Sequence, residues 1–360
     1  MSLLSDQIGF SIYVSQFKQQ KEQLASLYRS GSSIFTSLHV SEEVDAAYVQ
    51  SARTMCSWLH DTGYTIVADV SRETLKVFGK ADIVQFAEEM HISVLRIDCG
   101  FSVQEIAAVA KRMPVCVNAS TVSAADAAVI SDHAVKVYAL HNFYPRPETG
   151  LDPVFFEKKN AGFAQYGITA AAFIPGDIVK RGPIFAGLPT LECHRNVSPW
   201  AAFLDMKQTY HIDTIFSGDG VISPFDAGCI SNYCTADIAD IPVQFTESGS
   251  YLYGSVFTVR SDSPSWLMRL EESRAYAVPG KEIQPENCIE RKRGSVTIDN
   301  IGYKRYSGEI QILKKDFPAD SKVNVIGAVP EKYGLLLDSA ANGQKIRFIP
   351  VETERCHDAD

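Results

Sequence analysis

Carboxylates, amides and phenols recur at the ends of short apolar runs in the first two thirds of this 360-residue chain. The runs YTIVADVS, SVLRIDCG and DTIFSGDG carry Asp69, Asp98 and Asp219 near their carboxyl ends. Paired carboxylates provide the acid and base of glycoside hydrolysis, and carboxylates and amides also hydrogen-bond sugar hydroxyls. We therefore expect a site for a polyhydroxylated ligand, with carboxylates as its catalytic device.

Other polar residues occupy the same position after apolar runs. They are Tyr13, Ser15, His39, Glu42, Glu43, Asn118, Ser120, His141, Asn142, Tyr144 and Asp177. An aspartate at the end of a strand can instead cap the helix that follows it. Ser71 and Ser102 are alternative N-cap residues here, which leaves Asp69 and Asp98 available for a site.

Two long loops concentrate arginine and histidine. The first, 141–153, is stiffened by three prolines, and the second, 174–196, is rich in Gly and Pro. Together they carry His141, Asn142, Tyr144, Arg146, Arg181, Glu192, His194 and Arg195. A single arginine in an acidic protein can simply pair with a surface carboxylate. Three arginines in two constrained loops favour an anionic ligand such as a phosphate.

These residues need a scaffold that brings strand ends together. From residue 8 to about 223, eight apolar runs alternate with segments of helical period, which predicts parallel strands joined by helices. The predicted strands are 8–15, 33–40, 64–71, 93–100, 114–121, 135–144, 168–177 and 213–220. The count favours an α/β fold of the (β/α)8 TIM-type barrel, whose active sites lie at the carboxyl ends of the strands. No Gly-rich phosphate turn follows the first strand, which disfavours a doubly wound sheet.

The chain after about residue 240 has a different pattern. Short runs such as YLYGSVFTVRS and GSVTIDNIGYKRYSGEIQIL are separated by Gly, Pro, Asn and Asp. No helical pattern lies between them, which predicts a small antiparallel barrel or sandwich. We predict a catalytic barrel domain over 1–238, a C-terminal β domain over 239–352 and a disordered tail over 353–360.

Composition restricts location and partners. The chain has 34 Lys and Arg against 43 Asp and Glu, and the net charge of −9 disfavours nucleic acid. No apolar stretch is long enough to span a membrane and the first residues lack a secretory signal, so we expect a cytoplasmic protein. The eight cysteines fit buried thiols in a reducing compartment, although Cys229 and Cys234 are close enough in sequence for a metal or redox pair.

Several chemistries lack the residues that they require. No lysine ends a predicted strand, as a Schiff-base enzyme needs. The patterns HxH, HExxH and GxSxG do not occur. We therefore expect no cofactor and no metal.

Three long segments resemble one known family. HNFYPRPETGL, FIPGDIVKRGPIFAGLPTLECHR and GSVTIDNIGYKRYSGEIQI are together similar to the bacterial 6-phospho-N-acetylmuramidases, formerly a domain family of unknown function and sometimes labelled outer surface protein. The resemblance implies a barrel followed by a cyclophilin-like β domain. It also implies hydrolysis of the bond between N-acetylmuramic acid 6-phosphate and N-acetylglucosamine in peptidoglycan recycling.

That reaction assigns roles to the candidate residues. One carboxylic acid must protonate the departing oxygen, while a second group attacks the anomeric carbon, activates water or orients the 2-acetamido group. The candidate catalytic residues are Asp69, Asp98 and Glu192, with Asp219 in reserve. The predicted anion-binding residues are Arg146, Arg181, His194 and Arg195. The predicted sugar contacts are Asn118, His141, Asn142 and Tyr144. In the second domain, Tyr303, Arg305 and Tyr306 either close over the site or pack across strands.

Alternatives stay open at this stage. The sequence does not assign acid and base among the carboxylates, a retaining or inverting outcome, the role of the second domain, or the oligomeric state. The chain could be a non-catalytic phosphosugar-binding or regulatory protein that uses the same arginines. It could also be a glycosidase for another 6-phosphosugar. The expected partner in each case is a small phosphorylated sugar.

Overall fold

The computed structural model describes residues 4, 7–38, 47–97, 100–273 and 282–352. The chain divides into two compact units. One consists of Met1–Pro199 with Tyr210–Ser223, and the other of Trp200–Thr209 with Pro224–Asp360. The domain boundary expected between residues 238 and 239 stays a prediction.

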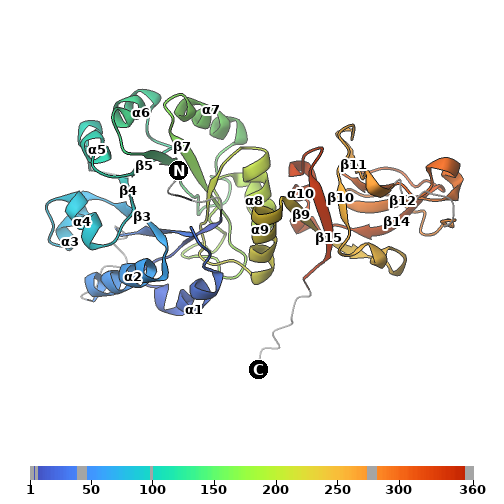
Figure 1. Ribbon diagram of the computed structural model, residues 1–360, viewed down its shortest axis with the longest axis horizontal. Coiled ribbons are helices and arrows are strands. Elements are labelled where there is room, and N and C mark those ends of the chain that lie inside the picture. Colours follow the sequence, from blue (N-terminus) through green and yellow to red (C-terminus); the bar gives the residue numbers. More distant parts are fainter. Residues whose placement is uncertain (1–3, 5–6, 39–46, 98–99, 274–281, 353–360) are drawn as a thin grey trace. The chain divides into compact units, whose positions relative to one another are not determined.

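The first unit contains a closed barrel of eight parallel strands within the described residues (Figure 1). The strands are β1 (Gly9–Ser11), β2 (Ser33–Ser37), β3 (Thr65–Val70), β4 (Val94–Ile97), β5 (Val115–Asn118), β6 (Val137–Leu140), β7 (Thr169–Ile174) and β8 (Thr214–Ser217). Strand β1 pairs with both β2 and β8, which closes the cylinder. Each strand lies inside one of the predicted runs, so the (β/α)8 fold is confirmed.

Helices connect these strands, as the segments of helical period predict. They are α1 (Phe17–Leu27), α2 (Tyr48–Thr62), α3 (Arg72–Val77), α4 (Ile83–Glu89), α5 (Val103–Ala110), α6 (Ala124–Ser131) and α7 (Pro153–Ala164). Ser71 and Ser102 form capping boxes at the starts of α3 and α5, which confirms their predicted role. Gly63 ends α2 with a backbone φ of 102°, a value that residues other than glycine rarely adopt.

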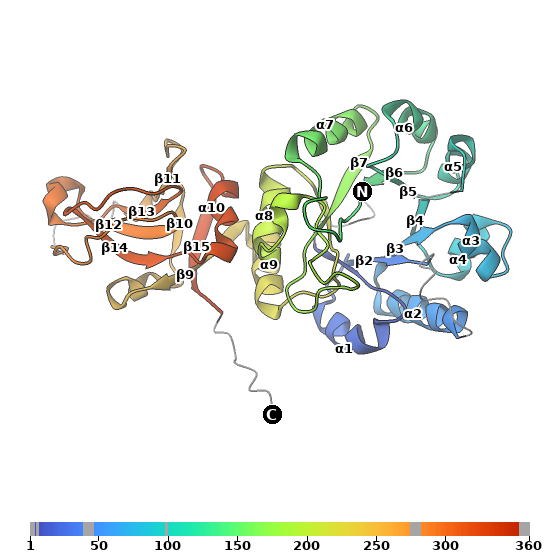
Figure 2. The same cartoon turned by 180° about the vertical axis from the view of Figure 1, so that it is seen from behind.

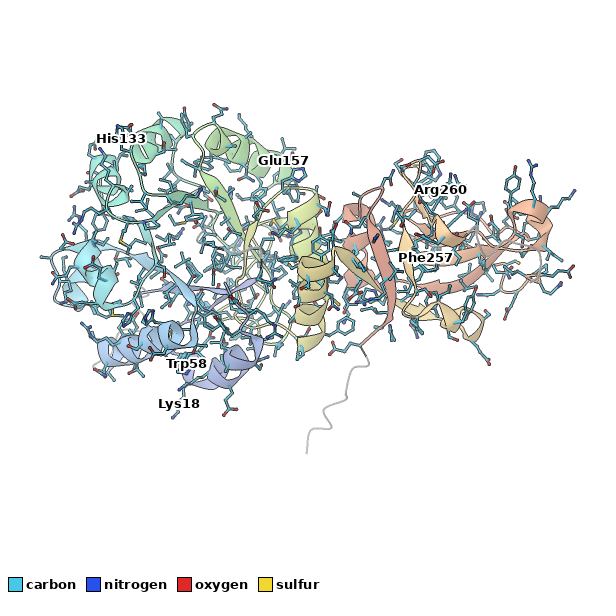
Figure 3. The ribbon with its side chains drawn as sticks, viewed as in Figure 1. Lys18, Trp58, His133, Glu157, Phe257 and Arg260 are labelled. Atoms are coloured by element: carbon cyan, nitrogen blue, oxygen red, sulfur yellow. The ribbon has the colours of Figure 1, made fainter. Side chains whose placement is uncertain are left out.

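The outer layer packs through aromatic rings. On α1 and α2, the rings of Phe17 and Trp58 lie 5.4 Å apart (Figure 3). Helix α1 ends at Leu27, because Tyr28 has an extended ψ of 134°. Within the described part of the chain, no helix has the length and apolarity that crossing a bilayer requires.

The barrel interior is filled by side chains that point inward from alternate positions. The buried cluster comprises Leu4, Phe35, Val67, Val94, Cys116, Tyr138, Leu140, Ala171, Phe173 and Phe216. The ring of Phe173 lies 5.1 Å from that of Phe35 and 5.9 Å from that of Phe216. The cylinder is therefore a packed core, and a ligand must bind above it rather than pass through it.

The second unit contains a seven-stranded sheet in the order β10-β15-β9-β14-β12-β13-β11 within the described residues (Figure 2). Its strands are β9 (Ile238–Phe245), β10 (Val256–Thr258), β11 (Leu267–Arg269), β12 (Ser295–Asp299), β13 (Ile310–Leu313), β14 (Val323–Ala328) and β15 (Lys345–Pro350). Strands β9 and β15 run parallel, so the expectation of a wholly antiparallel domain is wrong in this respect. The likeness to cyclophilins stays a prediction.

Helices α8 (Pro199–Gln208), α9 (Pro224–Ala236) and α10 (Leu335–Ser339) complete this unit. The indole of Trp200 on α8 donates to the carbonyl of Asp240 on β9 at 2.7 Å. The carboxylate of Asp240 in turn binds Arg347 of β15 through two hydrogen bonds of 2.7 and 2.9 Å. Phe257 packs on Phe348 at the opposite edge of β15 (Figure 3). One buried residue, Asp240, thus connects α8 through its backbone carbonyl and β15 through its carboxylate.

We predict that Phe216→Ala destabilises the barrel by about 3–5 kcal/mol, because this side chain is fully buried among other aromatic rings and its removal leaves a cavity. Val154→Ala on the exposed face of α7 is the control, with an expected change below about 0.5 kcal/mol. Urea unfolding monitored by circular dichroism measures both values. Equal stability of the two variants would contradict the proposed core.

Candidate active site

An ion pair between two neighbouring strands forms the base of the site. Asp69 of β3 and Arg96 of β4 are direct register partners in the parallel sheet. Both side chains point inward, because each lies two residues after a core residue, Val67 or Val94. The guanidinium Nη1 of Arg96 lies 2.9 Å from Oδ2 of Asp69, and the two residues are only 4% and 5% exposed. Removing either residue would leave the other buried charge without its ion-pair partner.

Arg96 also reaches the loop after β6. Its Nη2 donates to Oδ1 of Asn142 at 2.6 Å. One arginine thus connects a carboxylate of β3 with an amide beyond β6, across the mouth of the barrel. Charge-assisted hydrogen bonds of this kind restrict side-chain rotation, so the three polar groups have a defined arrangement before any ligand binds.

A second arginine lies over an aromatic ring at the same mouth. The guanidinium of Arg181 is centred 3.4 Å from the ring centroid of Tyr13. A guanidinium stacked on an aromatic face gains cation–π energy and keeps its edge available for hydrogen bonds in the plane of the group. This geometry suits an anionic or strongly polar ligand group.

These residues line one pocket of about 270 Å³. Its walls are Tyr13, Phe35, Ser37, Asp69, Arg96, Asn142, Phe143, Tyr144, Phe173 and Arg181. Phe35 and Phe173 belong to the packed core and form its apolar floor, while the charged groups come from the strand ends and loops. The pocket therefore combines an aromatic surface with a few fixed polar groups, as small-molecule sites usually do.

Asp219 supports the loop that carries Arg181. Its carboxylate accepts three backbone N–H bonds, from Gly176 at 2.9 Å, Arg181 at 3.0 Å and Leu188 at 3.0 Å. A Cβ atom at Gly176 would lie 2.8 Å from that of Asp219, so only glycine permits this approach. These hydrogen bonds hold the backbone of the 175–188 segment in place. The catalytic role of Asp219 stays a prediction.

Glu192 ties the two long loops together. It forms a two-pronged ion pair with Arg195, at 2.6 and 2.8 Å, and accepts the backbone N–H groups of Glu148 and Gly150 at 2.8 and 2.7 Å. Arg195, followed by the hydrogen bonds to the backbone, lowers the pKa of Glu192 to about 2, although partial burial opposes this shift. A carboxylate that remains charged at neutral pH is a poor general acid, so this geometry supports a structural task.

The predicted histidines lie inside the protein. His141 is fully buried, with Nε2 2.7 Å from Oδ1 of Asn160 and its ring against Phe156 of α7. Burial lowers the pKa of His141 to about 4, so this imidazole is neutral at pH 7. His194 is also fully buried, beside the ring of Tyr210. Neither histidine lines the pocket.

Some of the other predicted residues line the pocket and some do not. Asn142, Tyr144, Arg181 and Asp69 line the pocket. Oδ1 of Asn118 accepts the backbone N–H of Ser120, and Arg146 lies in an exposed part of its loop; neither is part of the pocket wall. His39, Glu42, Glu43 and Asp98 lie outside the described residues.

Sequence reasoning did not single out Arg96. It occupies the middle of the predicted strand 93–100, whereas the candidate site residues come from the carboxyl ends of the strands. Two-residue alternation would have identified it, because Val94, Arg96 and Asp98 occupy alternate positions of the same run. The described residues contain no group of three or more His, Cys, Asp or Glu side chains placed to hold a metal ion.

A closed (β/α)8 barrel with a charged, aromatic pocket at the carboxyl ends of its strands defines the chain as a protein of the TIM-barrel class. Residues 8–230 match the family described as 6-phospho-N-acetylmuramidase, N-terminal, and residues 240–349 match 6-phospho-N-acetylmuramidase, C-terminal. Because these matches cover nearly the whole chain, it belongs to the 6-phospho-N-acetylmuramidase family.

Solved structures share the architecture. A conserved protein from a locus in Enterococcus faecalis with an unknown function is 30% identical, with a TM-score of 0.82 over 96% of each chain. An uncharacterized B. cereus protein is 24% identical, with a TM-score of 0.77 over 96% of this chain and 100% of that one. The search among curated proteins found no match to this chain.

We predict that Glu192→Gln lowers the free energy of unfolding by about 1–2 kcal/mol at pH 7, because the charged partner of Arg195 is lost. The pKa of Glu192 is lower in the folded protein than its ordinary value of 4.5, so its charge stabilises the fold above pH 4.5. This contribution is lost as the pH falls towards 2. Urea unfolding across this pH range should show the difference between the two proteins shrinking, whereas the exposed Glu22→Gln control should match the wild type throughout.

Proposed function

We propose that this protein hydrolyses the glycosidic bond between N-acetylmuramic acid 6-phosphate and N-acetylglucosamine. Membership of the 6-phospho-N-acetylmuramidase family supports this substrate. The observation that carries the proposal is the connected array of Asp69, Arg96 and Asn142 in the same pocket as Arg181. Such a pocket offers hydrogen-bond acceptors, donors and positive charge to one polar ligand.

Asp69 is our leading candidate for the group that stabilises the reacting sugar. Among the described residues, it is the one predicted catalytic carboxylate that lines the pocket. A carboxylate beside the ring can stabilise positive charge at the anomeric carbon, attack it, or orient the 2-acetamido group. Its contact with Arg96 fixes its direction, so little reorganisation is needed as charge develops.

The second carboxyl group is proposed to be Asp98. It follows Arg96 by two positions in the sequence and lies outside the described residues, so this assignment rests on its place at the end of a predicted strand run. It would protonate the departing oxygen or activate water. The separation of the two carboxyl groups would then decide between retention and inversion of configuration.

Arg181 is proposed to bind the anionic part of the substrate. The sugar carries a phosphate and a lactyl carboxylate, and a guanidinium forms paired hydrogen bonds with either group. The cation–π contact with Tyr13 and the backbone bond to Asp219 together hold Arg181 at the pocket. Asn142 and Tyr144 are proposed to contact the sugar hydroxyls and the ring face.

We further propose a role in peptidoglycan recycling inside the cell. A disaccharide phosphorylated during uptake would meet the enzyme in the cytoplasm. The six described cysteines form no disulfide with one another, which is consistent with a reducing compartment; they are Cys56, Cys116, Cys193, Cys229, Cys234 and Cys288.

Release of N-acetylglucosamine from the 6-phosphorylated disaccharide tests the proposal. We expect turnover by the wild type and a fall in kcat of about a hundredfold or more in Asp69→Asn, because the charge that stabilises the transition state is removed. Thermal unfolding verifies that the variant is folded. Binding of the disaccharide without any product at any pH would instead support a non-catalytic binding protein, and wild-type turnover by Asp69→Asn would remove Asp69 from the mechanism.

Arg181→Ala should raise KM for the phosphorylated disaccharide by about tenfold or more, since one charge-assisted contact is lost. Arg112→Ala is the matched control, because Arg112 precedes β5 at the opposite end of the barrel and pairs with Asp82 on the surface. Steady-state kinetics with phosphorylated and unphosphorylated substrates separate the effects. Equal losses on both substrates would contradict an anion-binding role. Equally fast cleavage of a disaccharide without the lactyl ether would favour a glycosidase for another 6-phosphosugar.

A further inference from the structure

The second unit displays polar side chains on one face of three neighbouring strands. Register pairs Arg269 of β11 with Gln311 of β13, and Gln311 with Thr297 of β12. Glu309 lies two positions before Gln311, and Asp299 lies two positions after Thr297, so all five residues share this face. The backbone N–H of Asp299 donates to the carbonyl of Glu309 at 3.0 Å, which extends the pairing to these two residues.

The other face of the same strands is apolar. Ile298 and Ile310 point there, and with Ile326 they line a separate cavity of about 900 Å³. Packing of the hydrophobic interior therefore accounts for the apolar residues on one face of these strands. It does not account for the polar residues on the other face. Polar residues at partly buried sheet positions are uncommon, because each must be compensated by hydrogen bonds or charge.

The polar face borders a pocket of about 550 Å³, within the range of small-molecule sites. Its walls are Asp262, Pro264, Leu267, Arg269, Arg291, Asp299, Tyr303, Tyr306, Glu309, Gln311 and Val323. All of these residues belong to the second unit, so this pocket is independent of the barrel site. Nothing in the proposed hydrolysis uses it.

Asp299 is the most buried acidic group of this pocket that forms no ion pair with the described residues. The residue is 8% exposed, and its carboxyl oxygens make no hydrogen bond or ion pair with the described residues. Burial, followed by repulsion from Glu309 and Asp320, raises the pKa of Asp299 to about 7, although Arg291 and Arg269 oppose the shift. A largely buried carboxyl group that borders a cavity and has a raised pKa is a common mark of a ligand site.

The neighbouring charges are already arranged in pairs. Arg269 binds Glu309 through two hydrogen bonds of 2.6 and 2.9 Å, and Gln311 adds a third at 3.2 Å. At the rim, Arg260 holds Asp262 through two bonds of 2.7 Å (Figure 3). The pocket thus has a preformed wall of donors and acceptors in which positive and negative charges nearly balance.

Two tyrosines complete the pocket. They lie on the 3₁₀ segment Ile301–Tyr306, which directly follows β12. The hydroxyl of Tyr303 donates to Asp320 at 2.9 Å, which orients its ring. Tyr306 is 45% exposed and receives a hydrogen bond from Arg305 at 2.6 Å. Part-exposed tyrosine rings beside carboxylates can contact the C–H face of a sugar while polar neighbours bind its hydroxyls.

We propose that this pocket is a second, non-catalytic binding site for a neutral saccharide unit. Asp299, Glu309 and Asp262 would repel a phosphate or carboxylate, and Arg269 and Arg291 would repel a cation. The polar wall does not suit an apolar ligand. A sugar ring satisfies the remaining requirements, because its hydroxyls donate to Asp299 and accept from the guanidinium groups.

Fluorine NMR of the full chain labelled with 3-fluorotyrosine tests this site directly. Tyr303→Phe and Tyr306→Phe assign the two resonances, and N-acetylglucosamine is the probe. We expect both resonances to shift in a saturable manner as the sugar is added. Absence of any shift would overturn the proposal, and so would an equal shift with inorganic phosphate alone, which would identify an anion site.

Variants separate this site from the barrel. Asp299→Ala should weaken the apparent affinity about tenfold or more, because a hydrogen-bond acceptor in the wall of the site is lost. Tyr306→Ala, a change at an exposed position that the fold tolerates, should weaken it as well, as measured from the Tyr303 resonance. Tyr251→Ala changes an exposed tyrosine that borders the separate cavity of about 900 Å³; it is the matched control and should not alter the affinity.

Asp69→Asn in the barrel should also leave the shifts intact. Loss of the shifts in that variant would place the sugar in the barrel and overturn the second site. Catalysis by the wild type without any shift at Tyr303 and Tyr306 would refute the second site and leave the proposed hydrolysis standing.

Discussion

Two opposite charges lie side by side in the mouth of the barrel because parallel strands β3 and β4 place Asp69 and Arg96 in register on the same face. Each charge would be costly to bury alone, so the pair is stable only while both strands keep this register. Closure of the barrel fixes the register, since a shift of one residue would turn the side chains of a whole strand outward. The packed aromatic floor and the polar mouth therefore depend on one another.

Polar residues of the barrel unit have two different functions. Some face the pocket, as Asp69, Asn142 and Arg181 do. Others hold the loops that bring these groups together: Asp219 binds three backbone N–H groups, and Glu192 joins both long loops. A rigid site made from loops needs such supports, because an unsupported loop of more than twenty residues would sample many conformations. The residues that hold the loops are therefore of the same types as those that face the pocket.

In the second unit, alternation of side chains along the strands also separates polar from apolar residues. Alternation along β12 and β13 separates an apolar face, with Ile298 and Ile310, from a polar face, with Asp299 and Glu309. The barrel uses its inner face for packing and its strand ends for polar groups, whereas β12 and β13 place polar groups along one face of the strands. Residues in both units match models of the same family.

The sequence alone determined the eight strands, the capping boxes at Ser71 and Ser102, and the positions of polar residues along the strands, because alternation and capping are local properties. It also carried the resemblance to the family. Tertiary structure decided which of those residues meet. It put His141 and His194 in the interior, used Glu192 and Asp219 to support loops, and brought Arg96 to the pocket. Such contacts depend on register between strands and on loop paths, which join residues far apart in the chain and therefore leave no local pattern.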